Sequence, residues 1–174
     1  MVCSYLSNIK MPLILGRHTY YCEPQHIRGS MNDIYIGNFS SLAENIVWDG
    51  GFQHARAVTT FMMHKIFPEC PNNTVCNGDI YVGSDVWIGE NAMIMSGISI
   101  GDGAIIGARS VVRRDILPYE VYTGTETKQR FRFKMSYCEA LMDIKWWYWD
   151  DERIFANWPL LMSGDVEKFI KEHI

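Results

Sequence analysis

The sequence predicts an all-β solenoid, a column of short stacked strands, followed by C-terminal helices. The main evidence is an aliphatic residue at every sixth position, with glycine directly after four of these residues. The positions are Val82, Ile88, Ile94, Ile100, Ile106 and Val112. A helix, at about 100° per residue, would place them on three different faces, whereas a strand keeps them on one. Because one strand of this length would be far too long, we expect glycine to turn the chain at regular intervals.

An earlier copy of the repeat precedes this run. Ile36, Leu42 and Trp48 are again six residues apart, and the spacing between Leu42 and Val82 is not a multiple of six. We therefore predict a first coil within residues 1–33, a column over residues 34–118, and a long loop of about residues 49–78 that leaves the column. This loop is polar and punctuated by glycine and proline, and long loops on regular scaffolds often carry function.

The character of the sequence changes after Pro118, which closes the repeat. Residues 135–145 have the apolar spacing of a helix, and four aromatic residues follow at positions 146–149. Helical patterns resume from about Asp150 and again over residues 164–174. We predict that residues 119–174 form a helical appendage that caps the open end of the column, where strand edges would otherwise be exposed.

Composition excludes several classes of function. The net charge of −4 argues against nucleic-acid binding, and no apolar run reaches the ~18 residues of a membrane span. The first ten residues lack the apolar stretch of a secretory signal, and the five cysteines include no CxxC pair. A reduced, cytoplasmic protein is the simplest interpretation. Cys70 and Cys76 could pair or bind a metal, although no histidine lies at zinc-ligand spacing around them.

Several segments, taken in their order along the chain, carry a resemblance to a known family. They read Ile36-Gly-Asn-Phe-Ser-Ser-Leu-Ala, Gly51-Phe-Gln-His54 with Thr59-Thr-Phe, Ser84-Asp-Val-Trp-Ile-Gly89, Ile106-Gly-Ala-Arg-Ser-Val-Val, Lys128-Gln-Arg-Phe131 and Ile144-Lys-Trp-Trp-Tyr-Trp149. Over about residues 30–174 the sequence resembles the hexapeptide-repeat acyltransferases. The branch is that of the xenobiotic acetyltransferases, which includes streptogramin and chloramphenicol acetyltransferases.

The resemblance implies a fold, an assembly and a chemistry. The column would be a left-handed parallel β-helix, and three copies would form a homotrimer with active sites in the clefts between neighbours. Acetyl-CoA would be the cosubstrate, and His54 on the long loop would be the general base that removes the acceptor's proton. Histidine titrates in the range that this role needs. His64, on the same loop, is the rival base.

The resemblance also implies where CoA binds. Ala108 would offer a backbone contact, Trp87 would lie beside the CoA arm, and basic residues would meet the phosphates. The basic candidates are Arg113, Arg114, Lys128 and Arg130. This chain departs from the family at Gly124-Thr-Glu-Thr127, where Gly-Asn-Pro-Ala is common, which puts the adenine end of the site in question.

The acceptor pocket is expected to draw on the early coils and the loop. Tyr20, Tyr21, Glu23 and Asp49 are the candidates, because tyrosine and carboxylate groups suit a polyhydroxyl or amino acceptor. His18 and His26 lie in the same region, where solvated or structural roles are the simpler interpretation.

Three functions remain open at this stage. The favoured one is O- or N-acetylation of a small acceptor, with a sugar of surface polysaccharide synthesis preferred because Gly16–Glu23 matches the resistance enzymes only loosely. The alternative is acetylation of an antibiotic, either a streptogramin or chloramphenicol. A non-catalytic or γ-carbonic-anhydrase-like β-helix is a further alternative. Its metal would need histidines on neighbouring coils, and residues 82–118 contain none, so we expect no metal.

Overall fold

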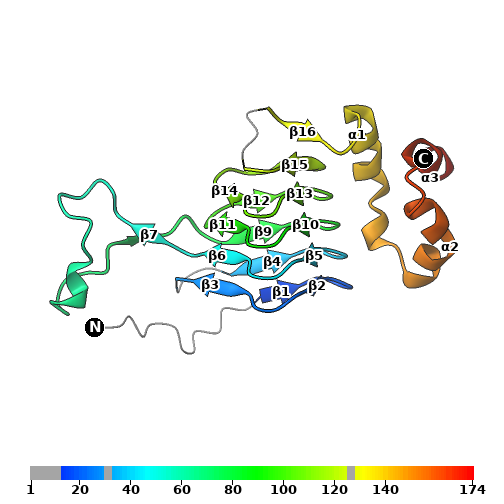
Figure 1. The fold of residues 1–174 in the computed structure, drawn as a ribbon. Helices are drawn as coiled ribbons and strands as arrows, with labels where there is room; N and C mark the ends of the chain where they lie inside the picture. The colour runs from blue at the N-terminus through cyan, green and yellow to red at the C-terminus, as the bar shows by residue number, and fades with distance from the viewer. Residues whose placement is uncertain (1–12, 30–32, 125–127) are drawn as a thin grey trace.

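The computed structural model describes residues 13–29, 33–124 and 128–174, and most of its strands form three mainly parallel sheets, beside one two-stranded antiparallel sheet. The chain visits sheets A, B and C in rotation, so that each turn of the chain adds one strand to each sheet (Figure 1). Sheet A contains β1 (Leu13–Leu15), β4 (Ile34–Ile36), β9 (Ile80–Val82) and β12 (Ser99–Ile100). Sheet B contains β2 (Tyr20–Tyr21), β5 (Ser41–Leu42), β10 (Trp87–Ile88), β13 (Ile105–Ile106), β15 (Glu120–Tyr122) and the antiparallel β16 (Arg130–Phe131). Sheet C contains β3 (His26–Arg28), β6 (Val47–Asp49), β11 (Met93–Met95) and β14 (Val111–Val112).

The six-residue repeat forms the core between these sheets, as predicted. All six aliphatic residues of the repeat are 5% exposed or less, and the earlier copy at Ile36, Leu42 and Trp48 is buried with them. The register stacks them: Ile94 lies between Trp48 and Val112 in sheet C. Burial of each such side chain contributes about 1.5–3 kcal/mol, so the interior rows stabilise the column along its length.

The glycines of the repeat act differently from the prediction. Gly83 and Gly89, like the other two glycines after the repeat positions, do not have positive φ angles; positive φ occurs two residues later, at Asp85 and Asn91. Glycine is needed instead because neighbouring coils approach closely. A Cβ on Gly89 would lie 2.6 Å from the backbone nitrogen of Ala108 in the next coil. The glycines therefore allow coils to stack at the corners, and other residues make the turn.

Three helices follow the column: α1 (Met135–Ile144), α2 (Asp151–Leu161) and α3 (Val166–His173). A short 3-10 helix, η2 (Trp146–Tyr148), links the first two. The carboxylates of Asp150 and Asp165 begin α2 and α3 by accepting hydrogen bonds from backbone amides of the first turn, at 2.7 and 3.0 Å. The helices pack around a second core that includes Trp147 and Phe169. Among the described residues, none of the helices has the length and apolar character needed to span a membrane.

The position of these helices corrects one prediction. They lie along the corner where sheet A turns into sheet B, and not across the end of the column (Figure 1). Asn38 in this corner donates a hydrogen bond to the Trp147 carbonyl at 3.2 Å, and Arg17 forms an ion pair with Asp151 at 2.5 Å. Both contacts fix the appendage to the first two coils, so these helices cover the side of the column.

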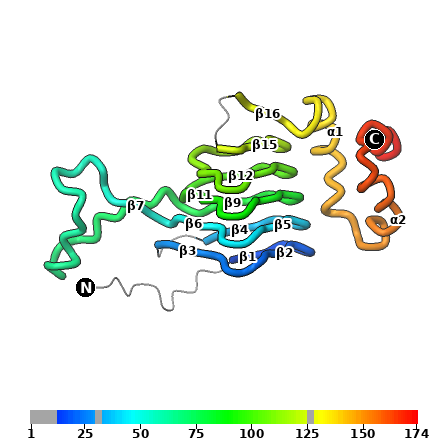
Figure 2. The backbone as a smooth tube through the Cα atoms, in the orientation of Figure 1, coloured from blue at the N-terminus to red at the C-terminus, as the bar shows by residue number. Residues whose placement is uncertain are grey.

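The long loop leaves the column after β6 and returns at β9 (Figure 2). Its base is an antiparallel pair of strands, β7 (Phe52–Gln53) and β8 (Thr74–Val75), and its outer part contains the 3-10 helix η1 (Met63–Lys65). The loop projects on the side opposite the helical appendage (Figure 2). It is less polar on its surface than predicted, because several large apolar side chains are exposed there, namely Val58, Phe61, Met63, Ile66 and Phe67.

Candidate functional site

His54 is the first residue beyond β7, at the point where the two paired strands of the loop open. Pairing of Phe52 with Val75 and of Gln53 with Thr74 fixes the backbone just before it. The side chain is exposed, and among the described residues its ring has no hydrogen-bond or ion-pair partner. An imidazole in this position can accept a proton from a bound molecule without first breaking a contact within the protein.

His64 is placed less favourably for proton transfer. It lies within η1, its side chain is half-buried, and its Nδ1 atom is buried without a hydrogen-bond partner among the described residues. A substrate would have to open this part of the loop to reach that atom. His54 is therefore the more accessible of the two predicted bases.

Trp87 and Tyr20 share the outer face of sheet B. Parallel pairing places Tyr20 beside Ser41 and Ser41 beside Trp87, and the tyrosine and tryptophan are 60% and 55% exposed. Two strand spacings separate them, about 10 Å. Tyr21, by contrast, is in register with the inward-facing Leu42, so it faces inward at the open end of the column, where it is 39% exposed. Of the two predicted tyrosines, only Tyr20 lies on the face of Trp87.

Ala108 and Glu23 both lie at the corner where sheet B turns into sheet C. The amides on either side of Ala108 are used by the coils: Gly107 donates to the Tyr122 carbonyl at 2.7 Å and Arg109 to the Glu90 carbonyl at 2.9 Å. The Ala108 amide makes no such bond among the described residues, and the residue is exposed. It can therefore donate to a ligand that passes along this corner.

Asp49 lies at the other end of sheet C, where the chain leaves for sheet A and the long loop has its base. It ends β6 and is aligned with Arg28 in β3 and Met95 in β11 on the outer face of that sheet. The loop begins directly after it. Asp49 and His54 therefore belong to the loop side of the molecule.

The four predicted phosphate-binding residues fall at two places. Arg113 and Arg114 follow β14 at the corner that leads into sheet A. Arg130 begins β16, the edge strand of sheet B, and Lys128 lies two residues before it. Arg113 and Lys128 are exposed. The departure from the family at residues 124–127 mostly lies outside the described residues.

Arg114 has a structural partner that the sequence did not reveal. Its two terminal nitrogens donate to both carboxylate oxygens of Glu120, at 2.6 and 3.2 Å, and Glu120 is 1% exposed. Burial alone would raise the pKa of Glu120, but hydrogen bonds from Arg114 and from the Leu117 amide lower that pKa below its usual value. The guanidinium is therefore already bound to a carboxylate, which competes with any phosphate.

The predicted residues thus form two groups on different sides of one chain. The first group, on sheet B and its corner with sheet C, contains Trp87, Tyr20, Ala108 and Glu23. The second, at the loop, contains His54 and Asp49. β7 and β10 lie far apart in Figure 1, and the loop points away from sheet B. A single chain does not bring the predicted base to the predicted CoA residues.

Other predicted groups have local roles. His18 contacts the Asp151 carboxylate at 3.0 Å and His26 contacts Asn45 at 3.3 Å, consistent with structural functions. Cys70 is a free thiol, so the disulfide considered between it and Cys76 does not form. Among the described residues, no three histidine, cysteine or acidic side chains are grouped as a metal site would require.

Comparison with known proteins places this geometry in context. A family model described as bacterial transferase hexapeptide (six repeats) matches residues 79–114. A chloramphenicol acetyltransferase of Agrobacterium fabrum is 34% identical over 91% of this chain and 86% of its own length. A protein of Lysinibacillus sphaericus named "Probable macrolide acetyltransferase" is 36% identical over 83% of this chain and 86% of its own length.

Two solved structures share the fold. A hexapeptide-repeat acetyltransferase of Vibrio cholerae, solved with acetyl coenzyme A, superimposes with a TM-score of 0.54 at 22% identity, over 70% of this chain and 59% of its own. The polySia-specific acetyltransferase NeuO superimposes with a TM-score of 0.52 at 25% identity, over 69% of this chain and 48% of its own.

Proposed function

Because this chain belongs to the hexapeptide-repeat acetyltransferases, we propose that it transfers the acetyl group of acetyl-CoA to a small acceptor, with His54 as the general base. The observation that carries the proposal is the exposed imidazole of His54 at the open end of the β7–β8 pair, which has no bonding partner within the described part of the chain. In this position His54 can reach a hydroxyl or amine that lies outside its own column.

The reaction needs only a few protein groups, provided that they are correctly positioned. His54 takes the proton from the acceptor as its oxygen or nitrogen bonds to the thioester carbonyl carbon. The same imidazolium then gives that proton to the CoA sulfur as the carbon–sulfur bond breaks, which leaves the histidine neutral again. Backbone amides at the corners of the coils are the candidates for stabilising the oxyanion that forms between these steps.

The residues of sheet B fit the CoA half of the reaction. Ala108 offers an exposed amide at a corner, which suits an amide or carbonyl of the pantetheine arm. The exposed ring of Trp87 lies one coil below, on the face that leads to this corner. Arg113, Lys128 and Arg130 are the basic residues that we assign to the phosphates, whereas the Arg114 guanidinium is already bound to Glu120.

The division of the site into two groups supports a homotrimer. We propose that the column is a left-handed β-helix and that the loop of one copy, with His54 and Asp49, meets sheet B of the next, with Trp87 and Tyr20. The exposed apolar side chains of the loop support this arrangement, because monomers rarely leave such surface uncovered. Cys22, Cys70 and Cys138 are reduced thiols, which fits a reducing cytoplasm, where we place the enzyme.

The relatives change the preference among acceptors. Chloramphenicol is the first candidate, because the similarity to chloramphenicol acetyltransferases extends over 91% of this chain. A hydroxyl-bearing sugar, which the sequence favoured, remains the second candidate through the similarity to the polySia-specific enzyme. Tyr20, Glu23 and Asp49 provide hydrogen-bonding groups that suit either acceptor. Tyr21 faces inward and is the weakest of the four acceptor candidates.

Release of the CoA thiol, followed by its reaction with a chromogenic disulfide, tests the function directly. Chloramphenicol, a streptogramin and a panel of hydroxyl and amino sugars would be offered with acetyl-CoA. We expect turnover with at least one of them, a loss of about 10²–10⁴-fold in kcat for His54→Ala, and near-normal turnover for His64→Ala. Normal turnover by His54→Ala would overturn the base assignment, and no turnover with any acceptor would overturn the proposed chemistry for this panel.

Mixed trimers test whether two chains build each site. His54→Ala would be combined with the Tyr20→Ala/Trp87→Ala double variant, each inactive or weakly active alone. If every site takes its base from one copy and its CoA face from the next, random mixing restores about a quarter of the sites. Failure to recover activity in a mixture shown to exchange subunits would contradict the shared site.

A further inference from the structure

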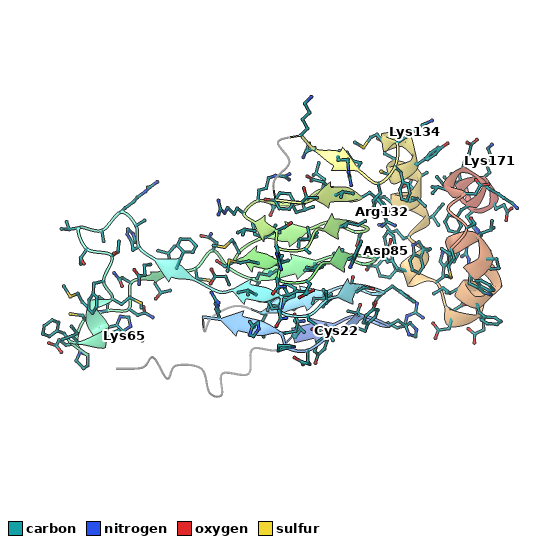
Figure 3. The ribbon with its side chains drawn as sticks, in the orientation of Figure 1. Cys22, Lys65, Asp85, Arg132, Lys134 and Lys171 are labelled. Carbon is teal, nitrogen blue, oxygen red and sulfur yellow. The ribbon has the colours of Figure 1, made fainter. Side chains whose placement is uncertain are left out.

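A cavity of about 500 Å³ lies between the column and the helical appendage, away from the long loop. The residues Phe39, Asp85 and Tyr119 form its wall on the column, where each lies at the corner between sheets A and B. Ile154, Trp158 and Leu161 of α2 line the opposite side. Figure 3 shows Asp85 and Arg132 between sheet B and the helices. The volume is within the range of small-molecule pockets, about 300–1,000 Å³.

Helix α2 leaves much of its apolar surface uncovered, although Asp151 at its start is bonded to Arg17 on the column. It has eleven residues and none of them is buried, and Trp158 and Phe155 remain 50% and 77% exposed. A second hollow of about 400 Å³ continues along the same helix and shares Phe39, Ile154 and Trp158 with the cavity. Both hollows open to solvent and are lined mostly by apolar side chains, as small-molecule pockets usually are. The unfilled space beside α2 therefore indicates a binding cavity.

Two polar side chains at the cavity, Arg132 and Tyr119, have hydrogen-bonding groups that no described residue uses. Arg132 uses its Nη1 atom for Asp85 at 3.0 Å and for the Gly103 carbonyl at 2.7 Å. Its Nε and Nη2 atoms have no hydrogen-bond partner among the described residues. The hydroxyl of Tyr119, a residue only 1% exposed, also lacks a partner there. The unused N–H groups of Arg132, whose side chain is 26% exposed, can donate hydrogen bonds to a ligand, whereas the Tyr119 hydroxyl lies buried behind the cavity wall.

The charges in the cavity specify the kind of ligand. Asp85 and Arg132 neutralise one another, and the side chain of each is 26% exposed. A charged ligand would bring an unpaired charge into an apolar space, which is costly. A guanidinium only donates hydrogen bonds, so the matching group is an uncharged acceptor such as a carbonyl or ether oxygen.

We propose that this cavity binds an uncharged, mostly apolar small molecule whose carbonyl or ether oxygen accepts a hydrogen bond from Arg132. The hydrocarbon or aromatic body of the ligand packs between Phe39 and the α2 side chains. The site is separate from His54 and does not depend on the proposed acetyl transfer.

The naphthyl ketone prodan tests this proposal, because it is uncharged, apolar and has one carbonyl, and its fluorescence shifts to the blue in apolar surroundings. We expect saturable binding of one prodan per chain, accompanied by quenching of tryptophan fluorescence. Ile154→Trp fills the cavity and should weaken binding by at least tenfold. Phe61→Ala, which changes the exposed apolar surface of the loop instead, should leave binding unchanged.

Controls keep the test decisive. If the melting temperature of Ile154→Trp falls sharply, Met162→Trp at the exposed mouth of the cavity replaces it. The anionic dye 1-anilinonaphthalene-8-sulfonate should bind this site at least tenfold more weakly than prodan. The proposal is wrong if prodan does not saturate, if its binding survives the filling variant, if Phe61→Ala abolishes it, or if the anionic dye binds the cavity equally well.

Discussion

Replacing Arg114 with methionine should destabilise the protein although nearly half of the Arg114 side chain is exposed. Its partner Glu120 is 1% exposed, and the variant leaves that carboxylate with only the Leu117 amide at 3.0 Å. Breaking a fully buried ion pair costs about 3–5 kcal/mol, and an exposed pair contributes under about 1 kcal/mol. Because the Arg114 side chain is 45% exposed, we expect an intermediate loss of about 2 kcal/mol.

Thermal and urea unfolding at a fixed chain concentration measure this loss. About 2 kcal/mol corresponds to a fall of roughly 4–8 °C in Tm for a chain of this length. Arg113→Met is the matched control, because Arg113 is exposed and has no ion pair among the described residues. Equal melting temperatures for the two variants would refute the structural role of Arg114.

The pH dependence gives a second measurement on the same variant. The pKa of Glu120 is lowered in the folded protein, so its contribution to stability is complete above the ordinary carboxyl pKa of about 4.3. That contribution is lost as the pH falls through the folded pKa. The difference in stability between wild type and Arg114→Met should therefore be constant from pH 7 to about 5 and shrink as the pH falls below about 4. A difference independent of pH would contradict this account.

Two further predictions concern the corner and the outer face of sheet B. Gly103→Ala should lower the free energy of unfolding by about 2–4 kcal/mol, because φ is +69° and the new Cβ would overlap the Tyr119 ring. Gly164→Ala, with φ +71° and open space around it, should lower it by about 1–2 kcal/mol. Equal losses in urea unfolding would disprove the overlap. Trp87→Ala should raise the KM for acetyl-CoA several-fold with a change in Tm under about 2 °C, because its ring is 55% exposed; an unchanged KM would remove Trp87 from the CoA site.

The interior of the column was predictable from the sequence because it depends on a local period. Ile88 in sheet B and Ile94 in sheet C are six residues apart, which is one strand and one corner, so both side chains point into the column. The outward position of Trp87 follows from the alternation of side chains along a strand. The role of the glycines was misread because a sequence does not distinguish a residue that turns the chain from one that a neighbouring coil approaches closely.

The site was predictable only in its parts. Sequence motifs identified His54 and Trp87 as site residues. Whether one chain brings the two together depends on where the long loop leaves the column. Asp85 and Arg132, which lie 47 residues apart, were missed as a pair. The only signal for them was their position inside or next to the Ser84–Gly89 and Lys128–Phe131 motifs.

The sequence by itself determined the rows of buried aliphatic residues, the segment that leaves them and the helices that follow, because each arises from spacing within a short stretch of chain. Tertiary structure alone decided that the helices lie along a corner, that Arg114 is held by Glu120, and that a cavity remains beside α2. These features depend on which corners of successive coils are stacked together. That stacking joins residues distant in sequence, and no local period records it.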